Sequence, residues 1–143
     1  MTDINEKNMA PENEIEEGKQ RSAELARLAI GALEDKKAED VRVIDIGGVS
    51  VLADYFIIAS GNNRAQVQAM ADEVEQRMGR AGAAPRQIEG YQAGNWVLMD
   101  FGDVIIHIFD AQNRLFYDLE RIWRDGKNMD PQTFMQEEAQ EEV

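Results

Sequence analysis

Two strands and a tight turn are encoded in residues 96–109, which read WVLMDFGDVIIHIF. Trp96–Asp100 and Val104–Phe109 are rich in β-branched, aromatic and other apolar residues, and both have the length usual for strands. The three residues between them, FGD, include the glycine that hairpin turns favour. We therefore predict an antiparallel hairpin here and build the rest of the fold around it.

Helices and further strands are expected on both sides of the hairpin. Apolar residues recur every three or four positions along residues 19–37 and again along 64–80, a spacing typical of amphipathic helices. The first stripe consists of Leu25, Leu28, Ala29, Ala32 and Leu33, and the second of Val67, Ala71, Val74, Met78 and Ala81. The asparagines at 62 and 63 are suited to cap the second helix. Strands are predicted at 41–46, 54–60 and 86–90, and a last helix at 114–123.

This order predicts an α/β fold in which a small mixed β-sheet is packed with helices. The chain has 143 residues, which suits one domain. Its ends are acidic: residues 1–20 hold six acids and two bases, and residues 125–143 hold six acids and one base. We expect 1–20 and 125–143 to be flexible acidic tails around a domain at 21–124.

Composition excludes several classes of function. The formal net charge of −13 disfavours binding of nucleic acid through its phosphates and suits a basic protein partner. The chain has no cysteine and a single histidine, which leaves few ways to build a metal site. No apolar run is long enough to span a membrane, and the N-terminal residues do not resemble a secretory signal. We expect a cytoplasmic protein that carries no cofactor.

Three aspartates near the hairpin raise an enzymatic alternative. Asp100, Asp103 and Asp110, together with His107, are residue types that hold Mg²⁺ in phosphoryl- and nucleotidyl-transfer enzymes. However, Asp110 ends the second strand, roughly 20 Å from the turn at about 3.3 Å per residue. Turn formation and helix capping explain these aspartates better, and His107 alternates with apolar residues as a structural histidine would.

Two aromatic residues are candidate anchors of an interface. Trp96 begins the first hairpin strand and Phe101 begins the turn that follows it, so we expect the hairpin to present both at one edge of the sheet. Large, rigid aromatic side chains are enriched among residues that dominate binding energy. Core packing is the alternative for both.

Three segments together resemble the ribosomal silencing factor family, also called the Iojap family. They are ADYFIIASGNNRAQV (53–67), IEGYQAGNWVLMDFGDVIIHIF (88–109) and RLFYDLERIW (114–123). The resemblance runs from about Leu25 to Trp123 and leaves out the acidic ends. It implies a nucleotidyltransferase-like topology, binding to ribosomal protein fourteen (L14) of the large subunit, and a block of small-subunit joining when nutrients are scarce. It also suggests a role in large-subunit biogenesis.

The partner-binding residues that follow from the hairpin and from this resemblance form one set. They are Trp96, Asp100, Phe101, Gly102, Asp103, His107, Tyr117 and Glu120. We expect no catalytic and no metal-binding residue. A Mg²⁺-dependent nucleotidyltransferase-like enzyme is the alternative function, and a homodimer formed through an apolar sheet face is compatible with ribosome binding.

Overall fold

The computed structural model describes residues 2–114, 124 and 126–141. The helices and strands are α1 (Thr2–Asp35), β1 (Glu39–Asp45), β2 (Tyr55–Gly61), α2 (Arg64–Arg80), β3 (Gln87–Glu89), β4 (Trp96–Asp100), β5 (Val104–Asp110), α3 (Ala111–Arg114), β6 (Lys127–Met129) and α5 (Pro131–Glu141). As far as β5 the elements follow the expected order, and after it the described residues form three elements that were not predicted, α3, β6 and α5. Most of the helix predicted at 114–123 lies outside the described residues.

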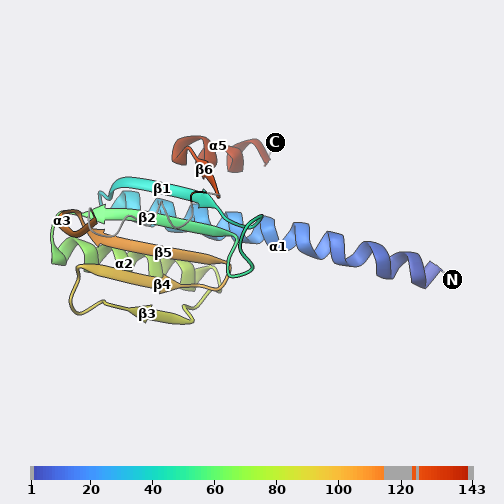
Figure 1. Ribbon diagram of the computed structural model, residues 1–143, viewed down its shortest axis with the longest axis horizontal. Helices are drawn as coiled ribbons and strands as arrows, with labels where there is room; N and C mark the ends of the chain where they lie inside the picture. The colour runs from blue at the N-terminus through green and yellow to red at the C-terminus, as the bar shows by residue number, and fades with distance from the viewer. Residues whose placement is uncertain (1, 115–123, 125, 142–143) are drawn as a thin grey trace.

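The strands form one mixed sheet in the order β3-β4-β5-β2-β1-β6 (Figure 1). β2 and β5 pair in parallel at its centre, and the other neighbouring strands are antiparallel. β4 and β5 are the expected hairpin, with Trp96 opposite Phe109. The β2 strand is buried along its whole length, as a central strand covered on both faces should be. The prediction of an α/β fold with a small mixed sheet is confirmed.

Helices α1 and α2 cover one face of this sheet and lie behind the strands in Figure 1. Both helices bury most of the stripes that their periodicity indicated. Leu28 remains 37% exposed while Ala26 and Ile30 are buried, and Ala81, which follows the end of α2, is partly buried. The cap of α2 is also as expected, because the Asn63 side chain accepts a hydrogen bond of 2.8 Å from the backbone N–H of Gln66. This helix-covered face holds the larger hydrophobic core.

A second hydrophobic cluster occupies the opposite face. It consists of Ile44, Ile46, Ala53, Phe56, Ile58 and Phe109, with Trp96 and Ile105 packed against it. Side chains alternate between the faces along each strand, so Trp96 on β4 and His107 on β5 belong to this face as well. We call the group of Phe56, Trp96, His107 and Phe109 the aromatic face.

The C-terminal segment is part of the fold, which differs from the flexible tail expected from residue 125. β6 adds to the sheet beside β1, with Met129 opposite Val43. Asp130 then caps α5 by accepting hydrogen bonds from Thr133, and Phe134 is 1% exposed. Burial of Phe134 against Tyr55, with ring centroids 5.3 Å apart, supplies the apolar contact that composition alone did not suggest.

The N-terminal helix is longer than expected. Its backbone is helical from Thr2, whereas the apolar periodicity placed its start near Lys19. The earlier residues extend past the sheet as one continuous helix (Figure 1). Glutamate, of which there are five in residues 2–18, is a good helix former even where no apolar stripe is present.

Candidate docking surface

Trp96 is a half-buried aromatic residue in a fixed position. It lies on the aromatic face, where its indole Nε1–H donates a hydrogen bond of 2.8 Å to Nδ1 of His107. Its ring also stacks on Phe109, with centroids 5.4 Å apart. The register explains both contacts, because Phe109 is directly opposite Trp96 and His107 is a diagonal neighbour on the same face. The side chain is therefore held in one orientation while part of it remains accessible.

His107 supports Trp96 from inside the fold. Its side chain is 6% exposed and packs against Phe56, with ring centroids 4.4 Å apart. Burial lowers the pKa of the His107 imidazole to about 4, so the ring is neutral at neutral pH. Because an indole N–H can only donate, Nδ1 of His107 must carry the acceptor lone pair. His107 was expected to contact a partner, but its burial suits it better to orienting Trp96.

Phe101 does not join Trp96 on the aromatic face. It is 9% exposed and belongs to the core on the helix-covered face. Five residues separate the two positions, and an odd separation along extended chain places side chains on opposite faces. The expectation that both would appear at one edge is therefore wrong for Phe101, and the strand alternation already contained the signal.

The hairpin turn uses its polar residues to fix its shape. The Asp100 carboxylate accepts a hydrogen bond of 2.7 Å from the backbone N–H of Gly102. Gly102 has a φ of +90°, a conformation that favours glycine. The Asp103 carbonyl accepts hydrogen bonds from the backbone N–H groups of Asp54 and Tyr55, which joins this turn to the start of β2. The Asp103 side chain is exposed.

The remaining predicted residues are not gathered into a metal site. Asp110 ends β5 and accepts a hydrogen bond from the backbone N–H of Gln112, so it caps α3. Among the described residues, no group of three or more His, Cys, Asp or Glu side chains is placed to hold a metal ion. Tyr117 and Glu120 lie outside the described residues, and their roles stay predictions.

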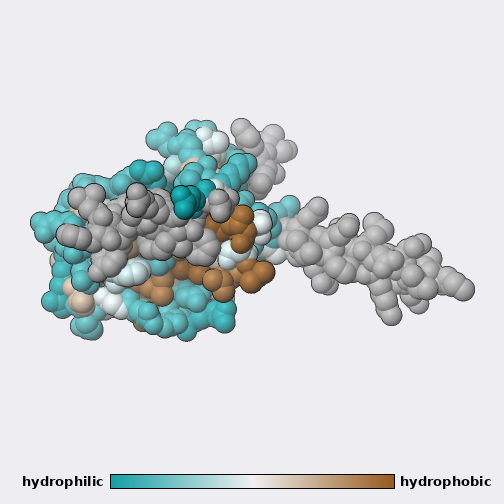
Figure 2. Space-filling view, viewed as in Figure 1, coloured by the Kyte–Doolittle hydropathy of each residue, from teal (hydrophilic) through white to brown (hydrophobic). Residues whose placement is uncertain are grey.

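The most exposed apolar segment among the described residues is a loop that was not among the predicted binding residues. Residues 46–54 connect β1 to β2, and Val49, Val51 and Leu52 in this loop are 53%, 104% and 67% exposed. Figure 2 shows hydrophobic surface gathered at this loop and continuing toward β4. The run VSVL between Gly47-Gly48 and Asp54 was the available signal.

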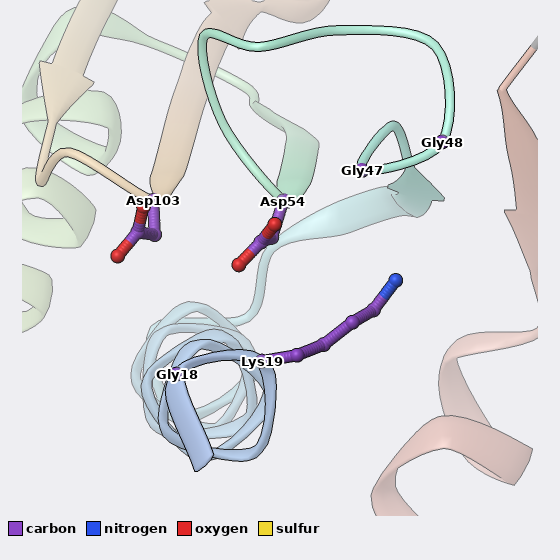
Figure 3. Close-up of a pocket in the computed structure, with 6 residues that line it drawn as sticks. All are labelled: Gly18, Lys19, Gly47, Gly48, Asp54 and Asp103. Atoms are coloured by element: carbon purple, nitrogen blue, oxygen red, sulfur yellow. The ribbon is translucent and has the colours of Figure 1, made fainter. Parts of the chain in front are cut away.

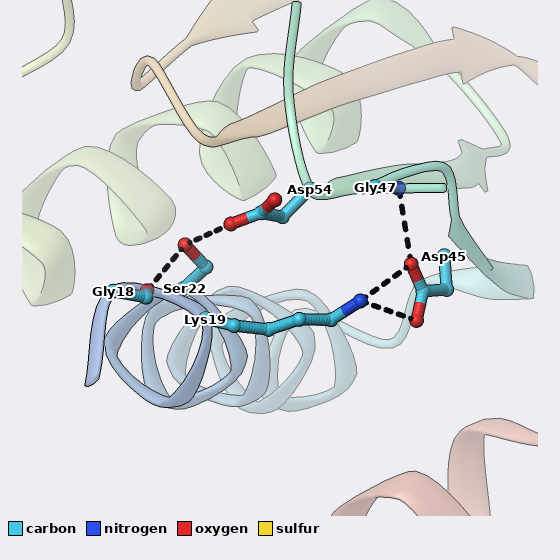
Figure 4. Close-up of polar contacts among 6 residues, drawn as sticks. All are labelled: Gly18, Lys19, Ser22, Asp45, Gly47 and Asp54. Carbon is cyan, nitrogen blue, oxygen red and sulfur yellow. Dashed lines mark hydrogen bonds and ion pairs between the residues drawn. The ribbon is translucent and has the colours of Figure 1, made fainter. Parts of the chain in front are cut away.

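A cavity of about 470 Å³ opens beside this loop. It is lined by Gly18, Lys19, Gly47, Gly48, Asp54 and Asp103 (Figure 3). The Lys19 ammonium pairs with Asp45 at 3.0 Å, and the Ser22 hydroxyl donates a hydrogen bond of 2.8 Å to the Asp54 carboxylate (Figure 4). Helix α1, the loop and the hairpin turn thus meet at one end of the sheet.

The described part of the chain contains no helix with both the length and the apolar character needed to cross a membrane.

Comparison with known proteins finds a family and several relatives with a similar sequence. The sequence profile of the family described as "ribosomal silencing factor during starvation" matches residues 19–143. A ribosomal silencing factor RsfS of Halalkalibacterium halodurans is 41% identical over 107 residues, which cover 75% of this chain and 92% of that protein. The RsfS of Zymomonas mobilis is 42% identical over 106 residues, 74% of this chain and 80% of that one.

A solved structure shares the fold. The crystal structure of a Chromobacterium violaceum protein superposes on this chain with a TM-score of 0.70 and 37% sequence identity. The superposed region covers 71% of this chain and 85% of the Chromobacterium violaceum chain. The profile match begins at residue 19 and includes the C-terminal segment that packs on β1. The chain therefore belongs to the ribosomal silencing factor family.

Proposed function

We propose that this protein binds the large ribosomal subunit through ribosomal protein fourteen and thereby prevents the small subunit from joining. Translation would fall when nutrients are limiting, and the same binding would serve a second role in large-subunit biogenesis. Membership of the family and the names of the relatives support a ribosome-associated regulatory role. We expect the protein to act in the cytoplasm.

The observation that carries this proposal is the fixed, half-buried Trp96. Binding is stronger when an aromatic anchor is already ordered, because less side-chain entropy is lost on association. The hydrogen bond to His107 and the stacking on Phe109 supply that order. Truncating such an anchor typically costs about 2 to 4 kcal/mol of binding free energy.

Charge favours a protein surface over nucleic acid as the direct contact. The net charge of −13 would repel phosphates, whereas it would speed the encounter with a basic ribosomal protein. Steric exclusion of the small subunit needs no turnover, so the mechanism requires neither a catalytic residue nor a cofactor. Asp100 does not support the enzymatic alternative, because its carboxylate accepts a hydrogen bond from Gly102 and so stabilises the turn.

Cosedimentation with purified large subunits tests the proposal. We expect the wild type to pellet with large subunits and Trp96→Ala to lose at least about tenfold in affinity. Tyr91→Phe is a matched control, because it removes only a hydroxyl that donates to Asp72, and the Tyr91 ring packs against the helix-covered core and not on the aromatic face. Failure of the wild type to cosediment, or equal binding by Trp96→Ala, would overturn the proposal.

A homodimer remains a separate prediction that is compatible with this function. Light scattering of the free protein over a range of concentrations would decide it.

A further inference from the structure

The loop at residues 46–54 holds aliphatic side chains in water. Val51 is fully exposed, and Val49 and Leu52 are more than half exposed. The loop has a defined shape, since the backbone N–H groups of Val49 and Ser50 donate to the carbonyl of Ile46 and the N–H of Leu52 donates to the Ser50 hydroxyl. A structured loop that presents several aliphatic side chains together is typical of an interaction surface.

Negative charge borders this apolar loop. Figure 3 shows the carboxylates of Asp54 and Asp103 on the cavity side, with Lys19 reaching in from α1. Lys19 is already paired with Asp45. The cavity therefore carries surplus negative charge from Asp54 and Asp103. The glycines at its rim leave access open, and a Cβ atom at Gly48 would meet nothing within 4 Å.

We infer that this end of the sheet is a second contact region, which takes a basic, aliphatic segment of the same ribosomal partner. An aliphatic side chain of the partner would cover Val51 and Leu52, and a lysine or arginine head would sit between Asp54 and Asp103. This inference rests on the proposed function and adds the chemistry of the partner segment to it. The hydrophobic surface continues from the loop toward β4, the strand that begins with Trp96, so one partner can cover both regions (Figure 2).

Charge also decides against the other occupants. A second copy of this chain in a two-fold contact would bring the Asp54 and Asp103 carboxylates of both copies together. An anionic membrane surface would be repelled by the same carboxylates and by the net charge of −13. A basic protein segment is the occupant that satisfies both the apolar loop and its acidic border.

Methyl NMR spectra of the full chain test this inference without the ribosome. The ligand is an acetylated, amidated Leu-Lys-Leu peptide at millimolar concentration, and Leu-Glu-Leu is its matched control. We expect the methyl signals of Val49, Val51 and Leu52 to shift with the lysine peptide, and the shifts to fall at least about threefold with the glutamate peptide or in Asp103→Asn. Equal shifts with both peptides, or none, would overturn the inference. Concentration-dependent shifts of these methyls without peptide would also overturn it, in favour of a second copy.

Binding to large subunits distinguishes this inference from the proposed function. We expect the double variant Val51→Ser, Leu52→Ser to bind large subunits about fivefold to tenfold more weakly, with an unchanged melting temperature because both side chains are exposed. Leu28→Ser, at an exposed apolar site on α1, should bind normally. If the wild type binds subunits and the double variant binds equally well, the second contact is wrong and the Trp96 surface stands. If the wild type does not bind subunits while the lysine peptide shifts the loop, the proposed function fails and the chemistry of the loop stands.

Discussion

At the scale of single residues, the pair formed by Trp96 and His107 connects the fold to the proposed function. Neither residue is unusual by itself: one is a strand tryptophan and the other a buried histidine. Their hydrogen bond of 2.8 Å joins neighbouring strands on the aromatic face. His107 is 6% exposed, so it has little surface to offer a partner, and we expect it to act through Trp96.

Replacing His107 separates positioning from packing. His107→Phe keeps a planar ring but removes the acceptor for the indole N–H, so we expect affinity for large subunits to fall about fivefold, in line with a hydrogen bond of about 1 kcal/mol. His107→Asn places an oxygen near the position of Nδ1 and should restore most of the affinity. Titration of large subunits measures both variants. Equal affinity of the wild type and His107→Phe would show that His107 has no positioning role.

The low pKa of His107 also makes stability depend on pH. Burial lowers its pKa from 6.5 to about 4 in the folded protein, so below about pH 6.5 the unfolded chain binds a proton that the folded protein does not. The free energy of unfolding should therefore fall by about 3 kcal/mol as the pH is lowered from 6.5 to 4. Above pH 6.5, His107 should not contribute to the pH dependence of the free energy of unfolding.

Urea unfolding across this pH range checks the prediction, with His107→Asn as the reference that lacks the group. His107 is the chain's single histidine, so the difference between the two proteins isolates its contribution from that of the carboxylates. Parallel pH profiles would contradict the assigned burial effect.

At the scale of elements, the C-terminal segment, β6 and α5, is held in place by contacts with α1 and β1. Arg27 is 3% exposed, donates a hydrogen bond of 3.0 Å to the carbonyl of Phe134 and lies over the Phe134 ring at 4.8 Å. Its guanidinium also lies 3.7 Å from the Glu137 carboxylate. A buried arginine with these contacts orders α5, which explains why an acidic, polar stretch folds here.

Phe134→Ala tests the role of this segment in stability. We expect the free energy of unfolding to fall by about 3 to 5 kcal/mol, because a fully buried aromatic ring is removed. Gln136→Ala, at an exposed position two residues later, should change it by no more than about 0.5 kcal/mol. Chemical denaturation measures both variants. If Phe134→Ala has the same free energy of unfolding as the wild type, the segment does not contribute to the stability of the fold.

Sequence patterns could predict those elements whose signals are local. Helix α2 combines an asparagine cap with a regular apolar stripe, and the bounds of β4 agree with the predicted strand at both ends. The C-terminal strand β6 is three residues, KNM, and depends on pairing with β1, so no local period identifies it. The nucleotidyltransferase-like topology that the resemblance implied stays a prediction.

The candidate site was predictable only in part. Trp96 was identified from its residue type, whereas its partner His107 depends on which residues face each other across two strands. Phe101 was expected at the same edge of the sheet as Trp96, although strand alternation places the two side chains on opposite faces. The exposed loop was passed over because exposure of Val51 and Leu52 follows from tertiary structure, and apolar residues in a sequence usually indicate burial.

At the scale of the whole molecule, charge and shape serve the same proposed role. The chain carries 28 acids and 15 bases, and one end of its sheet combines an apolar loop with carboxylates. The long acidic helix α1 extends from that end (Figure 1). Flexibility of residues 1–20 stays a prediction.

The rate of binding should depend strongly on salt. The Debye length shortens from about 30 Å at 0.01 M salt to about 8 Å at 0.15 M, so attraction to a basic ribosomal surface is increasingly screened. We expect the association rate constant with large subunits to fall at least about tenfold over this range, while the dissociation rate constant changes less. Surface-immobilised subunits and a flow assay separate the two rates. A salt-independent association rate would contradict electrostatic steering.

The most direct test of the central claim is the rate at which purified large and small subunits join, followed by light scattering. Wild-type protein, mixed first with large subunits, should slow joining in proportion to its occupancy, while Trp96→Ala at the same concentration should leave the rate close to that of subunits alone. If the wild type leaves joining unchanged at concentrations that saturate its binding to large subunits, steric exclusion is not what this protein does.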